Sequence, residues 1–252
     1  MNTVVDIILP NYNKGIYLEE TINSVINQTF LNWKLIIIDN HSTDYSKKII
    51  KKYSSHQKIS TIFLKKNKGA SFSRNLGIRT SNSKYISFLD ADDIWDKKKL
   101  ENQINYMQKN NYSFTYTDYT PFLEKNHLRV FKKTIKPSPS FNYDQFINDS
   151  SIGTTTMILS RELIGLIKFP KVKTLEDFSF KCKILKKSIT AYKFNENSTY
   201  YRITKNSLTS NKFKNLYWLW YINKNHNNLN YFENLKSLIN ISINSFKKYG
   251  FK

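Results

Sequence analysis

Three carboxylates stand close together near the middle of the chain, at Asp90, Asp92 and Asp93. They follow the apolar segment 85–89 directly and precede a helical pattern. Like charges at this spacing repel one another unless a cation neutralises them. Because alternate residues of a strand point the same way, Asp90 and Asp92 can present oxygens on one side to Mn²⁺ or Mg²⁺, a hard ion that also binds phosphates. A bare Asp-x-Asp is more often a solvated turn with a helix cap, but its place at the end of a strand favours a metal site.

The elements that must position these carboxylates alternate along the first half of the chain. Apolar β-branched runs predict strands, and apolar residues at helical spacing predict helices between them. This alternation predicts an α/β fold in which helices flank both faces of a mostly parallel central sheet. The predicted strands are 4–9, 35–38, 59–64, 85–89 and 113–118, and the helices are 18–26, 44–53, 69–80 and 96–110.

Two further polar clusters, 11–14 and 39–44, also follow predicted strands. Ligands of parallel sheets bind beyond the carboxyl ends of the strands, so three clusters on one edge indicate one binding site. The chain has neither a Gly-x-x-x-x-Gly-Lys loop nor a Gly-x-Gly-x-x-Gly fingerprint. This argues against P-loop NTPases and dinucleotide oxidoreductases, but not against a nucleotide held by side chains and metal.

The second half of the chain is less regular. A polar segment with three prolines predicts a long loop over 119–142. Beyond it the patterns predict strands at 152–160, 190–194 and 199–203, and helices at 161–166 and 176–186. We therefore expect one domain over 1–212, with halves 1–118 and 119–212, and a basic amphipathic helical tail over 213–252.

Composition sets wider limits on the class of protein. The chain has 252 residues and a formal charge of +21, which indicates either a polyanionic partner or a chain rich in Lys, Asn and Ile for compositional reasons. A single cysteine, Cys182, excludes an internal disulfide and a multi-cysteine metal site. The N-terminus does not resemble a signal peptide, and no apolar run approaches the ~20 residues that span a bilayer. These features predict a cytoplasmic protein.

Nine segments, taken in order, resemble the family-two glycosyltransferases with the GT-A fold. The resemblance extends from residue 4 to about residue 212, and its last two segments are most similar to bacterial enzymes that build teichuronic acid, capsule or other cell-surface polysaccharides. It implies transfer of a sugar, with inversion, from a nucleotide-diphosphate donor such as a UDP-sugar to a glycan or lipid-linked glycan. The segments are 7–13, 24–30, 37–44, 67–69, 73–77, 85–93, 152–157, 175–178 and 201–212.

The resemblance assigns roles to individual residues. Asp39 and Asn40 match the acidic pair that meets a uracil base, although Asn40 replaces an acid and His41 stands where glycine is usual. The loop that lines the nucleotide pocket carries Pro10, Tyr12 and Asn13.

The remaining matches concern the phosphates, the metal and catalysis. Arg74 matches a basic residue near the donor phosphates, and Asp177 matches the catalytic base unless it is only a helix N-cap. Asp90 matches the acid that contacts the ribose or the metal, and Asp92 matches the metal ligand. Glu176 and Arg202 match positions near the acceptor or a closing loop.

Three rival functions remain. A sugar nucleotidyltransferase needs a Gly-rich N-terminal loop with a basic residue, and this chain has none. A nucleic-acid-binding protein concentrates its basic residues on one face among aromatics, whereas the lysines here are scattered, so we expect no nucleic-acid partner. An inactive relative would not be expected to keep Asp90, Asp92 and Asp177.

The tail combines lysines with an apolar helical stripe. It either lies on the anionic inner face of the cell membrane or packs on the catalytic domain. The stripe consists of Phe232, Leu235, Ile239, Ile243 and Phe246.

Overall fold

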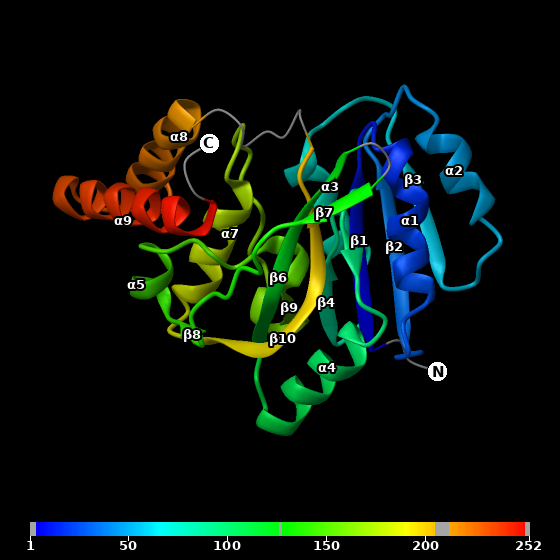
Figure 1. The fold of residues 1–252 in the computed structure, drawn as a ribbon, viewed down its shortest axis with the longest axis horizontal. Helices are drawn as coiled ribbons and strands as arrows, with labels where there is room; N and C mark the ends of the chain where they lie inside the picture. Colours follow the sequence, from blue (N-terminus) through cyan, green and yellow to red (C-terminus); the bar gives the residue numbers. More distant parts are fainter. Residues whose placement is uncertain (1–3, 126–127, 205–211, 250–252) are drawn as a thin grey trace.

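A twisted sheet lies between layers of helices in the computed structural model, which describes residues 4–125, 128–204 and 212–249 (Figure 1). The order of its main strands is β3-β2-β1-β4-β9-β6-β10-β5, and the first four are parallel. Chain order reverses between β1 and β4, so the carboxyl ends of these two strands form a topological switch point, where ligands of open sheets bind. The bounds are β1 Val5–Asn11, β2 Trp33–Asp39, β3 Ile59–Phe63 and β4 Tyr85–Phe88.

Both faces of the parallel strands are buried, which explains their unbroken apolar runs. In β1, Ile7 and Leu9 pack on one face with α1, α2 and α4, while Ile8 packs on the other with α3 and α7. The helices expected in the first half are confirmed. The bounds are α1 Gly15–Ile26, α2 Ser46–Lys52, α3 Ala70–Thr80, α4 Lys99–Asn110 and α7 Glu176–Leu185.

The prediction of a loop over 119–142 is wrong for residues 119–125 and 128–131, whereas residues 132–139 form a loop with one isolated bridge at Ile135. Strand β6 (Phe114–Lys125) continues through Pro121 and forms a hairpin with β7 (Leu128–Phe131). Proline removes only the amide donor, and the Pro121 carbonyl still accepts a hydrogen bond from the Lys132 amide at 2.7 Å. Phe122 is fully buried, and its ring lies 5.7 Å from that of Phe131.

The strands predicted in the second half differ from the structure in their bounds. The strands predicted at 190–194 and 199–203 are one strand, β10 (Ala191–Arg202), whose register against β6 shifts on both sides of Asn197. These irregularities break the alternation that a sequence pattern detects. The strand predicted over 152–160 exists only as β9 (Ile158–Ser160), because a 3₁₀ turn, η1 (Thr154–Thr156), precedes it.

The remaining elements complete the second half and the C-terminal helices. Strand β5 closes one edge of the sheet, and α8 and α9 lie beside α7 and α5 at the other end of the molecule (Figure 1). The bounds are β5 Ile94–Trp95, β8 Ser140–Phe141, α5 Tyr143–Phe146, α6 Arg161–Ile164, α8 Lys212–Asn225 and α9 Tyr231–Tyr249. Residues 205–211, which fall within the last segment of the resemblance, lie outside the described residues.

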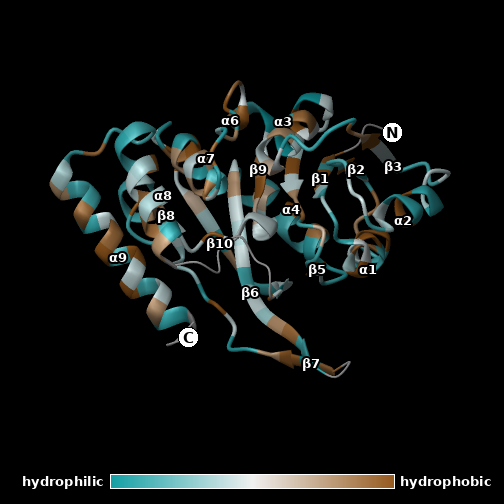
Figure 2. Ribbon diagram, turned by 90° about the horizontal axis from the view of Figure 1, so that it is seen from above, coloured by the Kyte–Doolittle hydropathy of each residue, from teal (hydrophilic) through white to brown (hydrophobic). Residues whose placement is uncertain are grey.

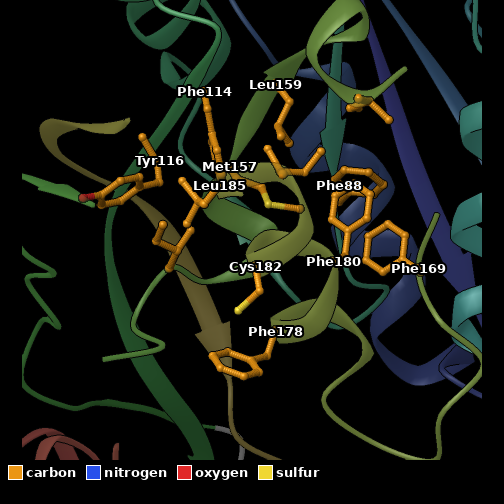
Figure 3. Packing of buried hydrophobic residues seen from close by; sticks show 14 of the residues in the cluster. Phe88, Phe114, Tyr116, Met157, Leu159, Phe169, Phe178, Phe180, Cys182 and Leu185 are labelled. Carbon is orange, nitrogen blue, oxygen red and sulfur yellow. The ribbon is translucent and has the colours of Figure 1, made fainter. Parts of the chain in front are cut away.

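An aromatic stack joins α7 to the central sheet (Figure 3). The rings of Phe169 and Phe180 are parallel, with centroids 3.9 Å apart, and Phe88 of β4 meets Phe169 edge-on at 5.3 Å. Such pairs stabilise by about 0.5–1.5 kcal/mol beyond the area they bury. The stack therefore fixes the first half of α7 against β4, the strand that precedes Asp90.

Candidate functional site

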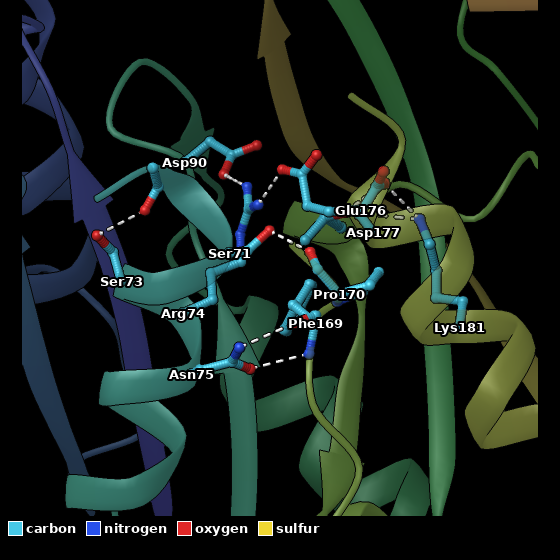
Figure 4. Close-up of polar contacts among 12 residues, drawn as sticks. Ser71, Ser73, Arg74, Asn75, Asp90, Phe169, Pro170, Glu176, Asp177 and Lys181 are labelled. Atoms are coloured by element: carbon cyan, nitrogen blue, oxygen red, sulfur yellow. Dashed lines mark hydrogen bonds and ion pairs between the residues drawn. The ribbon is translucent and has the colours of Figure 1, made fainter. Parts of the chain in front are cut away.

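The carboxylates predicted as a metal site lie where expected, directly after β4 at the switch point. The guanidinium of Arg74, only 6% exposed, bridges two of the acids at this edge (Figure 4). Its Nη2 donates to Oδ1 of Asp90 at 2.7 Å, and its Nη1 donates to Oε1 of Glu176 at 2.8 Å. Arg74 thus joins residues that belong to the two predicted halves of the domain.

Arg74 is held in place by close packing of α3. A Cβ on Gly77 would lie 2.4 Å from the side chain of Ile8, so only glycine lets α3 approach β1 this closely. The side chain of Asn75 makes two hydrogen bonds of 2.9 Å to the backbone of Phe169, whose ring lies 5.5 Å from the Arg74 guanidinium. Burial acts to lower the pKa of Arg74, but the carboxylates of Asp90 and Glu176 outweigh it and raise the pKa.

Asp92 has a cation partner that its sequence motif does not indicate. The Lys14 ammonium donates to Oδ2 of Asp92 at 2.6 Å across 78 residues of sequence. Burial raises the pKa of Asp92, and Lys14 offsets part of that effect. The only earlier signal for Lys14 is its place in the polar cluster after the first strand.

Arg202 lies beneath the Asp90–Asp93 loop and not in an open cleft. Its side chain is 2% exposed, and its backbone amide donates to Oδ1 of Asp93 at 3.0 Å. Its Nε donates to the carbonyl of Asp92 at 2.9 Å, while its other nitrogens pair with Glu20 and Glu124. Burial, with the nearby Asp92 and Asp90 charges, raises the pKa of Asp93 well above its ordinary value.

Asp177 lies in the first turn of α7 beside Glu176, and its side chain is 32% exposed. Its Oδ2 accepts hydrogen bonds from Thr154 at 2.7 Å and from the buried Lys181 at 2.8 Å. Burial would raise the pKa of Asp177, but Lys181 and Thr154 dominate and lower it. The alternative of a helix N-cap is wrong, because the N-cap of α7 is Leu175, with φ of 59°.

The residues expected near a nucleotide base shape the loops after β1 and β2. Asp39 is 1% exposed and accepts hydrogen bonds from the Asn11 side chain at 2.9 Å and the Ser42 amide at 3.0 Å. The side chain of Asn40 bonds to Asn67 and to the Lys68 amide, each at 2.8 Å. Both side chains therefore hold the loops in one conformation.

The neighbouring loop residues are more open. Tyr12 is 46% exposed, and Pro10 is half-buried at the end of β1. The side chain of Asn13 accepts from the Thr43 amide at 2.8 Å, which ties the two loops together. His41 has φ of 66°, in the left-handed region that glycine adopts most readily. This conformation gives a physical reason for the glycine that is usual at its position.

The donor set fits a divalent ion that shares its ligands with a substrate. Each aspartate has one oxygen paired with a cation, Oδ1 of Asp90 with Arg74 and Oδ2 of Asp92 with Lys14, which leaves the other oxygen of each for an ion. Over the described part of the chain, no three His, Cys, Asp or Glu side chains are grouped as a complete cage. Mg²⁺ commonly binds through one or two carboxylates together with water and substrate phosphates, which two aspartates at a rim allow.

Comparison with known proteins identifies the class. The family model described as Glycosyl transferase family 2 matches residues 6–168. TuaG of Bacillus subtilis, a glycosyltransferase assigned to teichuronic acid biosynthesis, is 34% identical over 201 residues, which is 79% of each chain. WfgD of Escherichia coli, a UDP-Glc:alpha-D-GlcNAc-diphosphoundecaprenol beta-1,3-glucosyltransferase, is 34% identical over 73% of this chain and 70% of its own.

Solved structures agree on the fold. TarS of S. aureus, residues 1–349 in complex with UDP-GlcNAc, has a TM-score of 0.74 over 97% of this chain and 73% of that chain, at 19% identity. The mannosyltransferase PcManGT of Pyrobaculum calidifontis, in complex with GDP-Man and Mn²⁺, has a TM-score of 0.64 over 87% of this chain and 61% of that chain, at 15% identity. The architecture is the GT-A fold of nucleotide-sugar transferases. The chain belongs to glycosyl transferase family 2 and is a glycosyltransferase.

Proposed function

We propose that this chain is an inverting, metal-dependent glycosyltransferase that moves a sugar from a UDP-sugar to a hydroxyl of a glycan or lipid-linked glycan in cell-surface polysaccharide synthesis. The observation that carries the proposal is the Arg74 bridge, which brings Asp90 and Glu176 together beside Asp177. The printed roles of TuaG and WfgD, and the UDP-GlcNAc bound to TarS, support the donor and acceptor classes.

The departing nucleoside diphosphate needs positive charge around its phosphates. A divalent ion at Asp90 and Asp92 supplies Lewis acidity to the diphosphate when bound. Arg74 adds a permanently charged guanidinium beside Asp90, and Lys14 adds an ammonium beside Asp92. In this proposal the donor phosphates bind at the rim after β4, between these two cations and the ion held by the two acids.

The acceptor hydroxyl needs a base. Because Lys181 and Thr154 lower the pKa of Asp177, this carboxylate is ionised at neutral pH and ready to accept a proton. The same partners weaken it as a base, so positioning must contribute much of the effect. Attack from the Asp177 side, opposite the nucleotide, inverts the configuration at the anomeric carbon.

The loops after β1 and β2 form the base end of the donor site in this proposal. Asp39 and Asn40 hold the two loops, and the exposed ring of Tyr12 offers a surface on which a base can stack. In this proposal a lipid-linked acceptor brings the enzyme to the inner face of the membrane, with the tail over 213–252 as the contacting part. Within the described residues, no helix is long and apolar enough to cross a bilayer.

A donor screen tests the proposed function. Purified protein is incubated with Mn²⁺ or Mg²⁺ and a panel of UDP-, GDP- and dTDP-sugars, and release of nucleoside diphosphate is followed with and without a diphosphoundecaprenol-linked sugar. We expect metal-dependent release with at least one UDP-sugar, stimulated by the acceptor. The Asp177→Asn variant serves as a matched negative control. If no sugar nucleotide binds or turns over, the proposal is wrong.

A further inference from the structure

Helix α9 packs on the rest of the protein through a side that combines polar groups with Leu238 and Ile241, which pack against the core. Asn234 is 1% exposed, and its side chain donates to the carbonyl of Trp220 at 3.1 Å. One turn further, the fully buried Ser237 donates to the carbonyl of Ile147 at 2.6 Å. Lys248 ends the series with an ion pair of 3.1 Å to Asp149. Amide, hydroxyl and ammonium groups thus face the domain.

The apolar side of α9 faces solvent. Four of the five side chains of the stripe are 79%, 41%, 50% and 47% exposed, in the order Phe232, Leu235, Ile239 and Ile243. At 3.6 residues per turn they lie opposite Asn234 and Ser237. Figure 2 shows α9 at the outer edge of the molecule, with hydrophobic residues along it. A surface helix normally keeps its apolar stripe against the core, so an exposed second stripe indicates contact with something outside the chain.

The spacing of the stripe indicates the shape of that partner. The four residues follow one another at intervals of three, four and four, so Phe232 and Ile243 are eleven residues apart. A coiled coil with a second helix needs intervals of three and four in alternation, and Ser242 occupies the position that such a repeat would fill. Eleven residues make about three full turns of an α-helix, so these four side chains stay in line along the axis of α9. A straight stripe suits a flat surface.

Charge indicates the chemistry of the partner. Lys236 and Lys247 are exposed along one side of the stripe, and Lys224 is exposed on α8. The protein carries a formal charge of +21, which opposes association of two copies and favours an anionic surface. Lysines beside a solvent-facing apolar stripe are typical of helices that lie in the plane of a membrane interface.

We propose that α9 lies flat on an anionic lipid surface, with Phe232, Leu235, Ile239 and Ile243 inserted among the lipids and Lys236 and Lys247 on the headgroups. This inference deepens the membrane contact of the proposed function and rests on that function only for the acceptor. Segment 147–149, on which α9 packs, precedes Thr154 of the site by five residues. Helix α9 and Asp177 therefore both form hydrogen bonds to the same short segment, residues 147–154.

Vesicle co-sedimentation tests the surface with the full chain. We expect wild type to bind phosphatidylcholine vesicles that contain phosphatidylglycerol, and to bind pure phosphatidylcholine weakly. Ile239→Glu combined with Ile243→Glu should reduce binding about tenfold or more, because both side chains already face solvent and the fold should persist. Leu166→Glu is the matched control, since Leu166 is 94% exposed outside α9 and this change should leave binding unaltered.

Two further measurements separate the possible outcomes. Nucleoside diphosphate release in the absence of lipid should be the same in wild type and in the double variant, so a failure of lipid binding is distinguishable from a failure of the transferase. Sedimentation equilibrium without lipid should show a monomer. A dimer that the double variant abolishes would assign the stripe to a second copy and overturn the proposal, as would unchanged binding of the double variant to anionic vesicles.

Discussion

Asp177→Asn should lower turnover by roughly 10²–10⁴-fold while leaving donor affinity close to wild type. The amide keeps the shape of the carboxylate but cannot usefully accept a proton. Asp177 lies on the far side of the Arg74–Glu176 pair from Asp90, so the donor end of the site should be unaffected (Figure 4). Release of nucleoside diphosphate measures turnover, and calorimetry measures donor affinity.

The structure also predicts a cost in stability. Lys181 is 2% exposed and would lose its charged partner, although it keeps a hydrogen bond of 2.6 Å to the carbonyl of Ile152. Loss of one partner from a fully buried pair costs about 3–5 kcal/mol. Because Asp177 is 32% exposed and an amide oxygen can still accept from Lys181, we expect about 1–2 kcal/mol, measured by urea unfolding.

The pH dependence of that cost has a definite sign. The folded-state pKa of Asp177 lies below its ordinary value of 3.8, so the carboxylate stabilises the folded state above that pH. This stability is lost only as the pH falls through the lower, folded-state pKa. The difference in unfolding free energy between wild type and Asp177→Asn should therefore stay constant from pH 5 to pH 8, apart from titration elsewhere.

Two variants separate catalysis from stability. Adding Lys181→Met to Asp177→Asn removes the buried ammonium that has lost its charged partner. The double variant should recover stability without recovering turnover. Asp144→Asn, in the first turn of α5, is a control that changes an exposed helix acid and should be silent in both assays. Near-normal turnover in Asp177→Asn would refute the reasoning and move the base to another residue, with Glu176 first to be tested.

Three further substitutions probe the rim and the core. Asp92→Asn should keep the fold but abolish most Mn²⁺-dependent binding of a UDP-sugar in calorimetry, and wild-type binding would end its assignment as a ligand. In the absence of a sugar nucleotide, Lys14→Gln should raise the affinity for Mn²⁺ by about three- to tenfold, because it removes the ammonium that pairs with Asp92. An unchanged affinity would show that Lys14 and the metal ion do not compete for Asp92. Burial lowers the pKa of Lys99 from 10.5 to about 7, so the folded state binds fewer protons than the unfolded state between these values and the unfolding free energy rises with pH there. Lys99→Met should stabilise by about 1–4 kcal/mol at pH 7 and by less near pH 10 in urea unfolding, and an equal gain at both pH values would contradict the shift.

The parallel half of the fold could be predicted because its signals are local. A buried strand and the helix after it each carry their pattern within about a dozen residues. The β6–β7 hairpin could not be predicted, because proline in a sequence pattern normally indicates the end of a strand. In this sheet Pro121 removes only one amide donor from the hydrogen bonds between strands. The burial of Phe122 against β7 stabilises this part of β6. A local sequence pattern cannot predict that contact, because it carries no information about the neighbouring strand.

The same distinction between local signals and contacts of distant residues applies to the site. The placement of Asp90 and Asp92 after a strand could be predicted from neighbouring residues, and the family resemblance indicated Arg74. The pairing of Lys14 with Asp92 and of Arg74 with Glu176 could not be predicted. Lys14 is 78 residues from Asp92, and Arg74 is 102 residues from Glu176. Only the folded chain brings these charges together. For α9 the pattern predicted the stripe, but the hydrogen bonds to Ile147 and Trp220 determine that it faces outward.

The contact between Gly77 and Ile8 has a consequence for how sequences of this fold can change. These two positions lie on different elements, yet they share one volume, because the space of a Cβ at residue 77 is taken by the Ile8 side chain. A relative that carries alanine at the position of Gly77 should therefore carry a smaller residue at the position of Ile8. A sequence with the larger residue at both positions would push α3 away from the sheet and move Arg74 away from Asp90 and Glu176. Paired variation at these two positions should therefore report, from sequences alone, how closely α3 packs on the sheet.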